Sequence, residues 1–233
     1  MSIKKHIPNL ITLLNLLCGC IAVVFASQSR FDLAFFFVCG GIFLDFFDGF
    51  FARLFKVSSP LGLQLDSLAD MVTSGVTPGL VMFQLMSNGN TLPAWFPFLG
   101  FLVTLGSCYR LANFNIDTRQ TDSFIGLPTP ANALFIMSLP LVLQHTDSLV
   151  LLEMLVNPWL LLAISVCSAF ILNAEIPLFS LKIKKIGFKG NELPILFMLY
   201  AAVLLVWLTY AALPVIILSY IILSVINNKF PHR

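Results

Sequence analysis

The chain has 233 residues, of which 58% are hydrophobic and only 10% are charged, and its mean hydropathy is +0.94. Soluble domains carry about 25% charged residues, so this composition excludes an ordinary soluble enzyme and predicts a polytopic membrane protein without a large soluble domain. The net charge of +2 is too small to indicate a nucleic-acid partner.

Apolar runs follow one another along the chain. Because a helix needs about 20 apolar residues to cross a bilayer, we predict an all-α membrane helix bundle of about eight transmembrane helices. The first run follows Lys4 and Lys5, is too long for a cleavable signal peptide and is interpreted as a retained span. The predicted spans cover residues 8–27, 31–54, 64–86, 92–114, 129–144, 157–174, 192–210 and 212–228.

Two connections between the predicted spans have a distinct composition. Residues 145–156 are interpreted as a short external connection that is partly helical. Residues 175–191 form a basic loop with interleaved apolar residues. This loop is expected in the cytoplasm, either as an ordinary connection or lying on the anionic leaflet, where each cation contributes about 1 kcal/mol.

The basic residues predict the orientation, because lysine and arginine accumulate in cytoplasmic loops. With eight spans and a cytoplasmic N-terminus, only Arg30 among the 13 basic residues falls outside. Both termini are therefore expected in the cytoplasm, and the chain is expected in the cytoplasmic (inner) membrane. A six-span alternative requires residues 192–228 to form one re-entrant pair.

Four aspartates form a regular frame across the second and third predicted spans. From Asp45 the pattern is Asp-x2-Asp-Gly-x2-Ala-Arg-x8-Gly-x3-Asp-x3-Asp. Carboxylates at membrane depth are expensive, so a group of them indicates a functional site. The fixed members of the frame are Asp45, Asp48, Gly49, Ala52, Arg53, Gly62, Asp66 and Asp70.

The spacing of the aspartates predicts where they meet. Asp45 and Asp48 are three residues apart, and Asp66 and Asp70 are four apart, so each pair shares one helix face. Antiparallel neighbouring helices would place both pairs at similar depth, a turn or two inside the cytoplasmic boundary. Ligands that are all oxygen favour a hard cation, and we predict one or two Mg²⁺ or Mn²⁺ ions facing phosphate oxygens.

The remaining members of the frame fit this interpretation. Gly49, Ala52 and Gly62 leave room for close helix approach or for a bulky polar ligand. Arg53 supplies a permanent cation suited to phosphate. The structural alternative, in which the carboxylates pair with arginines to hold helices together, needs more cations than Arg53 and Arg110 provide at this depth.

The frame resembles the signature of the CDP-alcohol phosphotransferase family, whose members are membrane enzymes that move a phosphatidyl or related group from a CDP-linked donor to an alcohol. Every signature position is matched, including the eight-residue gap from Arg53 to Gly62. The resemblance implies a six-helix core, which we assign to residues 1–174. The basic loop at 175–191 and the two additional C-terminal helices at 192–233 follow this core. The resemblance also implies a homodimer.

Three further stretches, residues 8–19, 109–115 and 124–131, resemble the bacterial and archaeal CDP-diacylglycerol–serine O-phosphatidyltransferases, the phosphatidylserine synthases of that family. Asn113 stands where this subgroup commonly has a second arginine. The resemblance implies CDP-diacylglycerol as donor, L-serine as acceptor, and phosphatidylserine and CMP as products.

The resemblance also implies roles for individual residues. Three aspartates of the frame would ligate the metal, and Asp70 would be a metal neighbour and the general base. The donor would lie against small, basic and polar residues of the first three spans. The metal set is Asp45, Asp48, Asp66 and Asp70, and the donor set is Gly49, Ala52, Arg53, Gly62, Asn9, Thr12, Thr73 and Ser74.

The acceptor pocket is predicted from the need to bind a carboxylate. A forked guanidinium is the best partner for that group, so Arg110 is the first candidate, with a positive-inside anchor as its alternative role. Arg119 is the second candidate. A phosphorylated acceptor, such as glycerol 3-phosphate or inositol phosphate, would need more clustered basic residues. A divalent-ion transporter is the remaining alternative, and Arg53 inside the frame counts against it.

Overall fold

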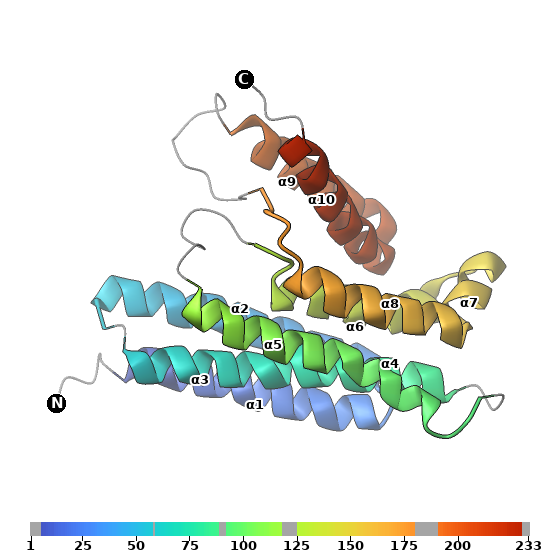
Figure 1. Ribbon diagram of the computed structural model, residues 1–233, viewed down its shortest axis with the longest axis horizontal. Coiled ribbons are helices and arrows are strands. Elements are labelled where there is room, and N and C mark those ends of the chain that lie inside the picture. The colour runs from blue at the N-terminus through green and yellow to red at the C-terminus, as the bar shows by residue number, and fades with distance from the viewer. Residues whose placement is uncertain (1–5, 58, 89–91, 118–124, 180–190, 230–233) are drawn as a thin grey trace.

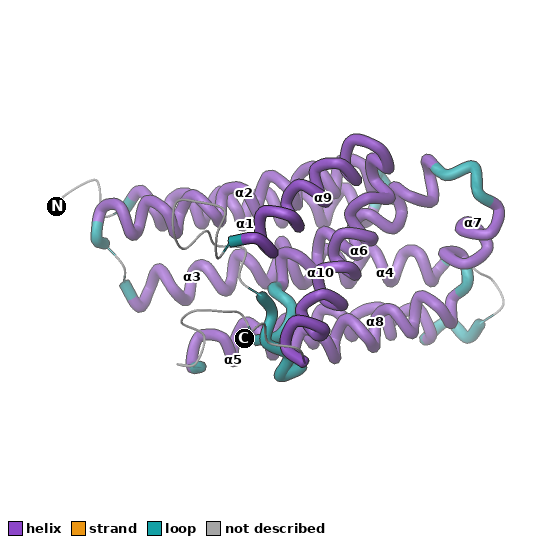
Figure 2. Tube along the Cα trace, turned by 90° about the horizontal axis from the view of Figure 1, so that it is seen from above, coloured by secondary structure: helices purple, strands orange, loops and turns teal. Residues whose placement is uncertain are grey.

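The computed structural model describes residues 6–57, 59–88, 92–117, 125–179 and 191–229. Within these ranges the chain is helical and contains no strand, as predicted (Figure 2). The elements are α1 (Ile7–Ser27), α2 (Phe31–Phe55), α3 (Pro60–Asp70), the π-helical segment η2 (Met71–Val76), α4 (Thr77–Ser87), η3 (Phe96–Phe101), α5 (Leu102–Ile116), α6 (Thr129–His145), α7 (Leu149–Val156), α8 (Pro158–Asn173), α9 (Glu192–Leu208), η4 (Thr209–Ala211) and α10 (Ala212–Lys229).

Helices α1 to α5 lie along the longest axis of the molecule (Figure 1). Helix α1 packs against α2 and α3, and α5 packs against α8 and η2. Helix α6 contacts α2, α4 and α10, so it joins the N-terminal helices to the C-terminal ones. Helices α9 and α10 contact each other and lie side by side, turned at η4 (Figure 1).

Helix α1 has the side-chain distribution of a lipid-facing helix. Large apolar side chains point outward, and Leu10 and Leu17 are more than half exposed. The buried face instead carries small or polar residues three or four positions apart, which let neighbouring helices approach closely without relying on burial of large apolar groups. That buried face is formed by Pro8, Thr12, Asn15, Gly19, Ala22 and Ala26.

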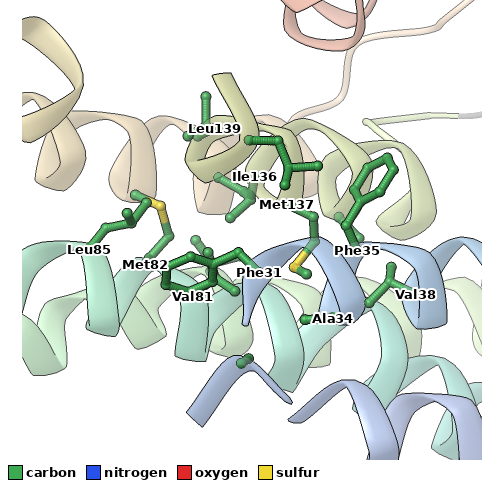
Figure 3. Packing of buried hydrophobic residues seen from close by; sticks show 14 of the residues in the cluster. Phe31, Ala34, Phe35, Val38, Val81, Met82, Leu85, Ile136, Met137 and Leu139 are labelled. Atoms are coloured by element: carbon green, nitrogen blue, oxygen red, sulfur yellow. The ribbon is translucent and has the colours of Figure 1, made fainter. Parts of the chain in front are cut away.

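The apolar core lies between α2, α4 and α6, away from the aspartates. Figure 3 shows its side chains meeting from these three helices. They include Phe31, Ala34, Phe35 and Val38 of α2, Val81, Met82 and Leu85 of α4, and Ile136, Met137 and Leu139 of α6. The core fixes α2 and α4 against α6. The C-terminal half of α2 and helix α3, which carry the aspartates, are thereby held at one end of the bundle.

Each predicted span coincides with a helical stretch, but the count of eight spans stays a prediction. Three stretches of the described chain are long and apolar enough to cross a membrane, and a fourth arises if a pair bent by 69° forms one span. Helices α6 and α8 have 17 and 16 residues, short of the about 20 that a straight span needs. The three stretches are Ile7–Ser27, Phe31–Phe55 and Glu192–Asn228, and the bent pair is Leu149–Val156 with Pro158–Asn173.

The orientation also stays a prediction. Residues 1–5, 118–124, 180–190 and 230–233, which carry many of the basic side chains used to assign it, lie outside the described residues. Arg119 is among them. The predicted connection at 145–156 is partly helical, as expected, because α7 occupies residues 149–156.

Gly41 of α2 marks a tight contact between the helices that carry the polar residues. A methyl group added there would lie 2.7 Å from both Asn15 Oδ1 and Thr73 Cγ2, whereas at the neighbouring Gly40 the nearest atom, Cys18 Sγ, is 4.0 Å away. Helix α2 can therefore approach α1 and η2 this closely only without a side chain at position 41.

We predict that Gly41→Ala destabilises the protein by about 1–3 kcal/mol, because overpacking forces its neighbours apart. Each kcal/mol lowers Tm by about 2–4 °C in a chain of this size. The measurement is thermal unfolding of the purified protein in detergent, with Gly40→Ala as the matched control. Equal Tm values for the two variants would contradict this description of the helix contact.

Candidate active site

Three carboxylates meet between α2 and α3. Asp45 and Asp48 lie one turn apart on α2, and Asp66 lies on α3. One carboxylate oxygen of each lies within 4.8 Å of the others. The predicted convergence of the two aspartate pairs from neighbouring helices is thus seen for these three side chains. Like charges this close repel one another strongly in a poorly solvated region, so the group needs compensating positive charge.

Helix α1 contacts the second aspartate of the frame. Thr12 Oγ1 donates a hydrogen bond to Asp48 Oδ2 at 2.5 Å, and Asp48 is only 6% exposed. The same hydroxyl lies 3.1 Å from the carbonyl oxygen of Pro8. Thr12, predicted as a donor-binding residue, is therefore placed where it orients Asp48.

Asp70 is not part of the group of three mutually close carboxylates and has its own partners. Its side chain is 7% exposed, and Asp70 Oδ1 accepts a hydrogen bond from Asn15 Nδ2 at 3.1 Å. Asn15 Oδ1 in turn accepts a hydrogen bond of 2.8 Å from Thr73 Oγ1. The Thr73 hydroxyl fixes which way the Asn15 amide points, so a donor faces Asp70.

A local change of helix type follows Asp70. Pro78 lies at the start of α4 and has no N–H to donate to the carbonyl of Ser74, four residues earlier, so the regular α-helical pattern is interrupted there. The chain adopts a π-helix over Met71–Val76, and Thr77 Oγ1 donates to the carbonyl of Val72 at 3.0 Å. Such π segments are frequent at functional sites.

The small and basic residues of the frame lie next to the carboxylates along α2 and α3. Arg53 is exposed in the last turn of α2, one turn after Gly49. A methyl group at Gly49 would meet only the Arg53 guanidinium, at 4.0 Å, and Ala52 is half-buried. A methyl group at Gly62 would lie 3.3 Å from Asn9 Oδ1, so the structure brings these two predicted donor-binding positions together.

Ser74 and Ser107 lie on two segments that contact each other, η2 and α5. Both residues are fully buried. Within the described part of the chain, neither hydroxyl has a hydrogen-bond partner. Ser107 lies against the backbone of η2, because a methyl group at Gly75 would be 3.3 Å from its Cβ.

Arg110 lies on α5 at about the level of Asp70. Two contacts set the register of α5 against α3 and η2: Asn115 Nδ2 donates to Ser67 Oγ at 2.9 Å, and Thr104 Oγ1 donates to the carbonyl of Gly75 at 2.9 Å. Asp70 and Arg110 both fall between these contacts on antiparallel segments. Arg110 is 5% exposed and its guanidinium carbon lies 5.2 Å from the centre of the Phe114 ring.

The residues present fit a divalent cation. Their ligand atoms are oxygens only, three carboxylates are close enough to share one ion, and hard cations such as Mg²⁺ and Mn²⁺ prefer oxygen ligands. Asp48 is additionally oriented by Thr12, as ligands of metal sites generally are by a neighbouring hydrogen-bonding group. A divalent cation held here could also coordinate phosphate oxygens.

Asn15 is the site residue that the sequence analysis missed. It is fully buried and links Asp70 to Thr73. Its position did carry a signal, because Asn15 follows Thr12 by three residues and therefore lies on the same face of α1. A polar amide on the helix face that already carries Thr12 would have indicated Asn15 as a further site residue.

A family model described as CDP-alcohol phosphatidyltransferase matches residues 5–171. The CDP-diacylglycerol–serine O-phosphatidyltransferase of Bacillus subtilis is 36% identical over 167 residues, which cover 70% of this chain and 83% of that protein. Proteins of the same name from Helicobacter pylori (strain J99) and Methanocaldococcus jannaschii are 36% and 32% identical, over 56% and 58% of this chain.

The chain spans 55% of the Helicobacter pylori protein and 62% of the Methanocaldococcus jannaschii protein. The residues matched by the family model contain all four aspartates and Arg110, and end before α9. Enzymes of this family generally depend on a divalent metal ion. The family match covers most of the chain, and with the aspartate cluster it shows that the chain belongs to the CDP-alcohol phosphatidyltransferase family.

Proposed function

We propose that the protein transfers the phosphatidyl group of CDP-diacylglycerol to the hydroxyl of L-serine, giving phosphatidylserine and CMP. The observation that carries the proposal is the group of three close carboxylates with a fourth, separately held carboxylate beside it. The relatives named CDP-diacylglycerol–serine O-phosphatidyltransferase support the choice of donor and acceptor.

Asp45, Asp48 and Asp66 are proposed to hold the metal ion, Mg²⁺ or Mn²⁺, with Asp70 as its neighbour. When bound, the cation would supply charge neutralisation for the pyrophosphate of the donor and for the departing CMP. The protein's own contribution is geometric: Asp48 is held by Thr12, and Asp66 is brought to α2 by the close packing of α1, α2 and α3.

Asp70 is proposed as the general base. Its carboxylate would take the proton from the serine hydroxyl, and the serine oxygen would form a bond to the phosphorus that carries diacylglycerol. The bond between that phosphorus and the oxygen bridging to CMP would break, and CMP would leave with the electron pair. Asn15 supports this role by holding one carboxylate oxygen of Asp70, which leaves the other available for the proton.

The donor is proposed to lie along the end of α2 and the start of α3. Gly49 and Ala52 leave space beside Arg53, and that guanidinium can pair with a phosphate. At the start of α3, Gly62 lies close to Asn9, and the half-buried amide of Asn9 is proposed to contact the donor. Thr12 and Thr73 were also predicted to bind the donor, but their contacts favour orienting roles towards Asp48 and Asn15.

The acceptor is proposed to bind between η2 and α5. Arg110 is the proposed partner of the serine carboxylate, since a guanidinium pairs with a carboxylate through two parallel hydrogen bonds. Ser74 was predicted to contact the donor, but its hydroxyl and that of Ser107 lie on the two facing segments, so Ser74 is proposed as an acceptor contact instead. A buried hydroxyl without a partner costs about 1–3 kcal/mol, so these groups favour a small polar ligand that would hydrogen-bond to them. The cytoplasmic position of the site and the homodimer remain expectations.

The proposed reaction is tested with the purified protein in detergent micelles. We predict that labelled CDP-diacylglycerol is converted to lipid product and CMP with L-serine, and not with glycerol 3-phosphate or inositol phosphate. EDTA should abolish activity, because without a cation the carboxylates repel one another without compensation. Addition of Mg²⁺ or Mn²⁺ should restore it. Product formed with a phosphorylated acceptor, and none with serine, would overturn the choice of acceptor. Ion flux into vesicles without CMP release would overturn the enzymatic proposal.

Two variants separate the base from its positioning residue. Asp70→Asn should lower kcat by about 10²–10⁴-fold, as expected for loss of a general base, while donor binding persists. Asn15→Ala should lower kcat by about 10–100-fold, the usual effect of removing a group that orients a site residue, with little change in the KM for the donor.

The control for these variants is Ser165→Ala, which removes a buried hydroxyl that, among the described residues, bonds to the carbonyl of Leu161 in its own helix. Steady-state kinetics on all three proteins is the measurement. Wild-type kcat in Asp70→Asn would show that another group is the base.

Arg110→Lys tests the acceptor pocket. The lysine keeps the charge and loses the paired hydrogen bonds, so the KM for serine should rise by about 10–100-fold, corresponding to the about 1.5–3 kcal/mol of a hydrogen bond to a charged group. The KM for CDP-diacylglycerol should stay within about twofold. Arg30→Lys is the matched control, because Arg30 precedes α2, at the opposite end of that helix from the aspartates. An unchanged KM for serine would exclude Arg110 from the pocket.

A further inference from the structure

A cavity of about 310 Å³ lies between α6, α8 and α10, in a part of the molecule that the proposed reaction does not use. None of the described residues that line it is Asp, Glu, Lys or Arg. Its walls are aliphatic and aromatic, with one amide and one hydroxyl among them. The lining residues are Leu127, Asn132, Phe135, Leu160, Ala163, Ile164, Cys167, Ser168, Ile171, Ile217, Leu218 and Ile221.

Asn132 is the polar feature of this cavity that lacks a partner. It is 1% exposed, and its Nδ2 makes no hydrogen bond to any residue that the structure describes. A buried N–H group without an acceptor is unfavourable, and the hydrocarbon walls offer none. The cavity therefore favours an occupant that is mostly hydrocarbon and carries a hydrogen-bond acceptor at one end.

The amide lies near one end of an elongated space. The backbone N–H of Leu127 donates to the carbonyl of Ile171 at 3.1 Å, so the start of α6, which carries Asn132, lies beside the end of α8. From Ile171 the cavity extends along α8 to Leu160, eleven residues and about 16 Å of helix. That length is about half of the roughly 30 Å hydrocarbon core of a bilayer, or one leaflet.

The lining of the cavity suits a hydrocarbon chain. Its volume of about 310 Å³ lies at the lower end of the range for small-ligand sites, and such sites are lined mainly by apolar side chains with a few polar groups. Aliphatic and aromatic side chains make up most of this lining.

We propose that this cavity binds one acyl chain of a bilayer glycerophospholipid, with the ester carbonyl of that chain accepting a hydrogen bond from Asn132 Nδ2. The acyl chain extends from Asn132 towards Leu160 and reaches the middle of the bilayer. Because none of the described lining residues is charged, the cavity does not select a headgroup, and phospholipids with different headgroups can bind. It is separate from the aspartate site and does not depend on the proposed reaction.

The test uses wild-type protein in phosphatidylcholine vesicles that contain a phosphatidylcholine with a photoreactive diazirine in one acyl chain. After irradiation, mass spectrometry of proteolytic fragments should locate most labelling in α6, α8 and α10. Ala163→Phe, which places a ring in the cavity, should reduce labelling of these fragments at least about fivefold. Asn132→Leu should reduce it by about 2–10-fold, the equivalent of one hydrogen bond.

The control is Ala202→Phe, an equal enlargement at an exposed position of α9 outside the cavity, which should label as wild type. Because neither Asn132 nor Ala163 belongs to the proposed active site, retained turnover reports correct folding of both variants, and Asn132→Leu still tests the site if Ala163→Phe does not fold.

Three results would overturn the proposal. Labelling that is equally strong in both cavity variants would mean that the lipid contacts the outer surface only. Loss of labelling on addition of CDP-diacylglycerol would assign the cavity to the donor instead of a bilayer lipid. Efficient cross-linking of two copies of the chain through Cys167, which lines the cavity, would show that a second protein molecule covers it.

Discussion

The structure depends on bringing carboxylates from two helices together in a region where charge is poorly solvated. Asp45, Asp48 and Asp66 approach within 4.8 Å, although their repulsion would separate α2 from α3 if nothing opposed it. Helix α1 opposes it: Thr12 hydrogen-bonds Asp48 and, one turn later, Asn15 hydrogen-bonds Asp70. A single helix face thus holds one carboxylate from each of the two segments.

This arrangement needs helices that pack closely. Gly19 and Gly41 have no room for a side chain, because Thr73 lies against both of them and Asn15 against the second. Absence of a Cβ at these two positions lets η2 reach α1 and α2, so that Thr73 can orient the Asn15 amide. Small residues at helix contacts in a membrane protein therefore serve the geometry of the site as much as the stability of the bundle.

The sequence predicted the elements that depend on local pattern. Apolar run lengths located the helices, and spacings of three and four residues placed each pair of aspartates on one face. The Asn15–Asp70 contact was not predicted, because it depends on how α1 packs against the end of α3. The π-helix was missed as well, since the hydrophobic pattern of residues 60–87 continues through it and the interruption comes from Pro78 and Thr77. The cavity between α6, α8 and α10 is lined by residues from three separate helices, so no local motif marks it.

The central claim is that Asp45, Asp48 and Asp66 form one metal site. Binding of Mn²⁺ to the purified protein, followed by electron paramagnetic resonance of the free ion, tests it most directly. Wild type should bind Mn²⁺, and Asp48→Asn should weaken that binding at least about tenfold, because a charged ligand is lost. Asp32→Asn, an exposed aspartate in the first turn of the same helix, should bind as wild type does. Equal Mn²⁺ affinity in wild type and Asp48→Asn would contradict the account.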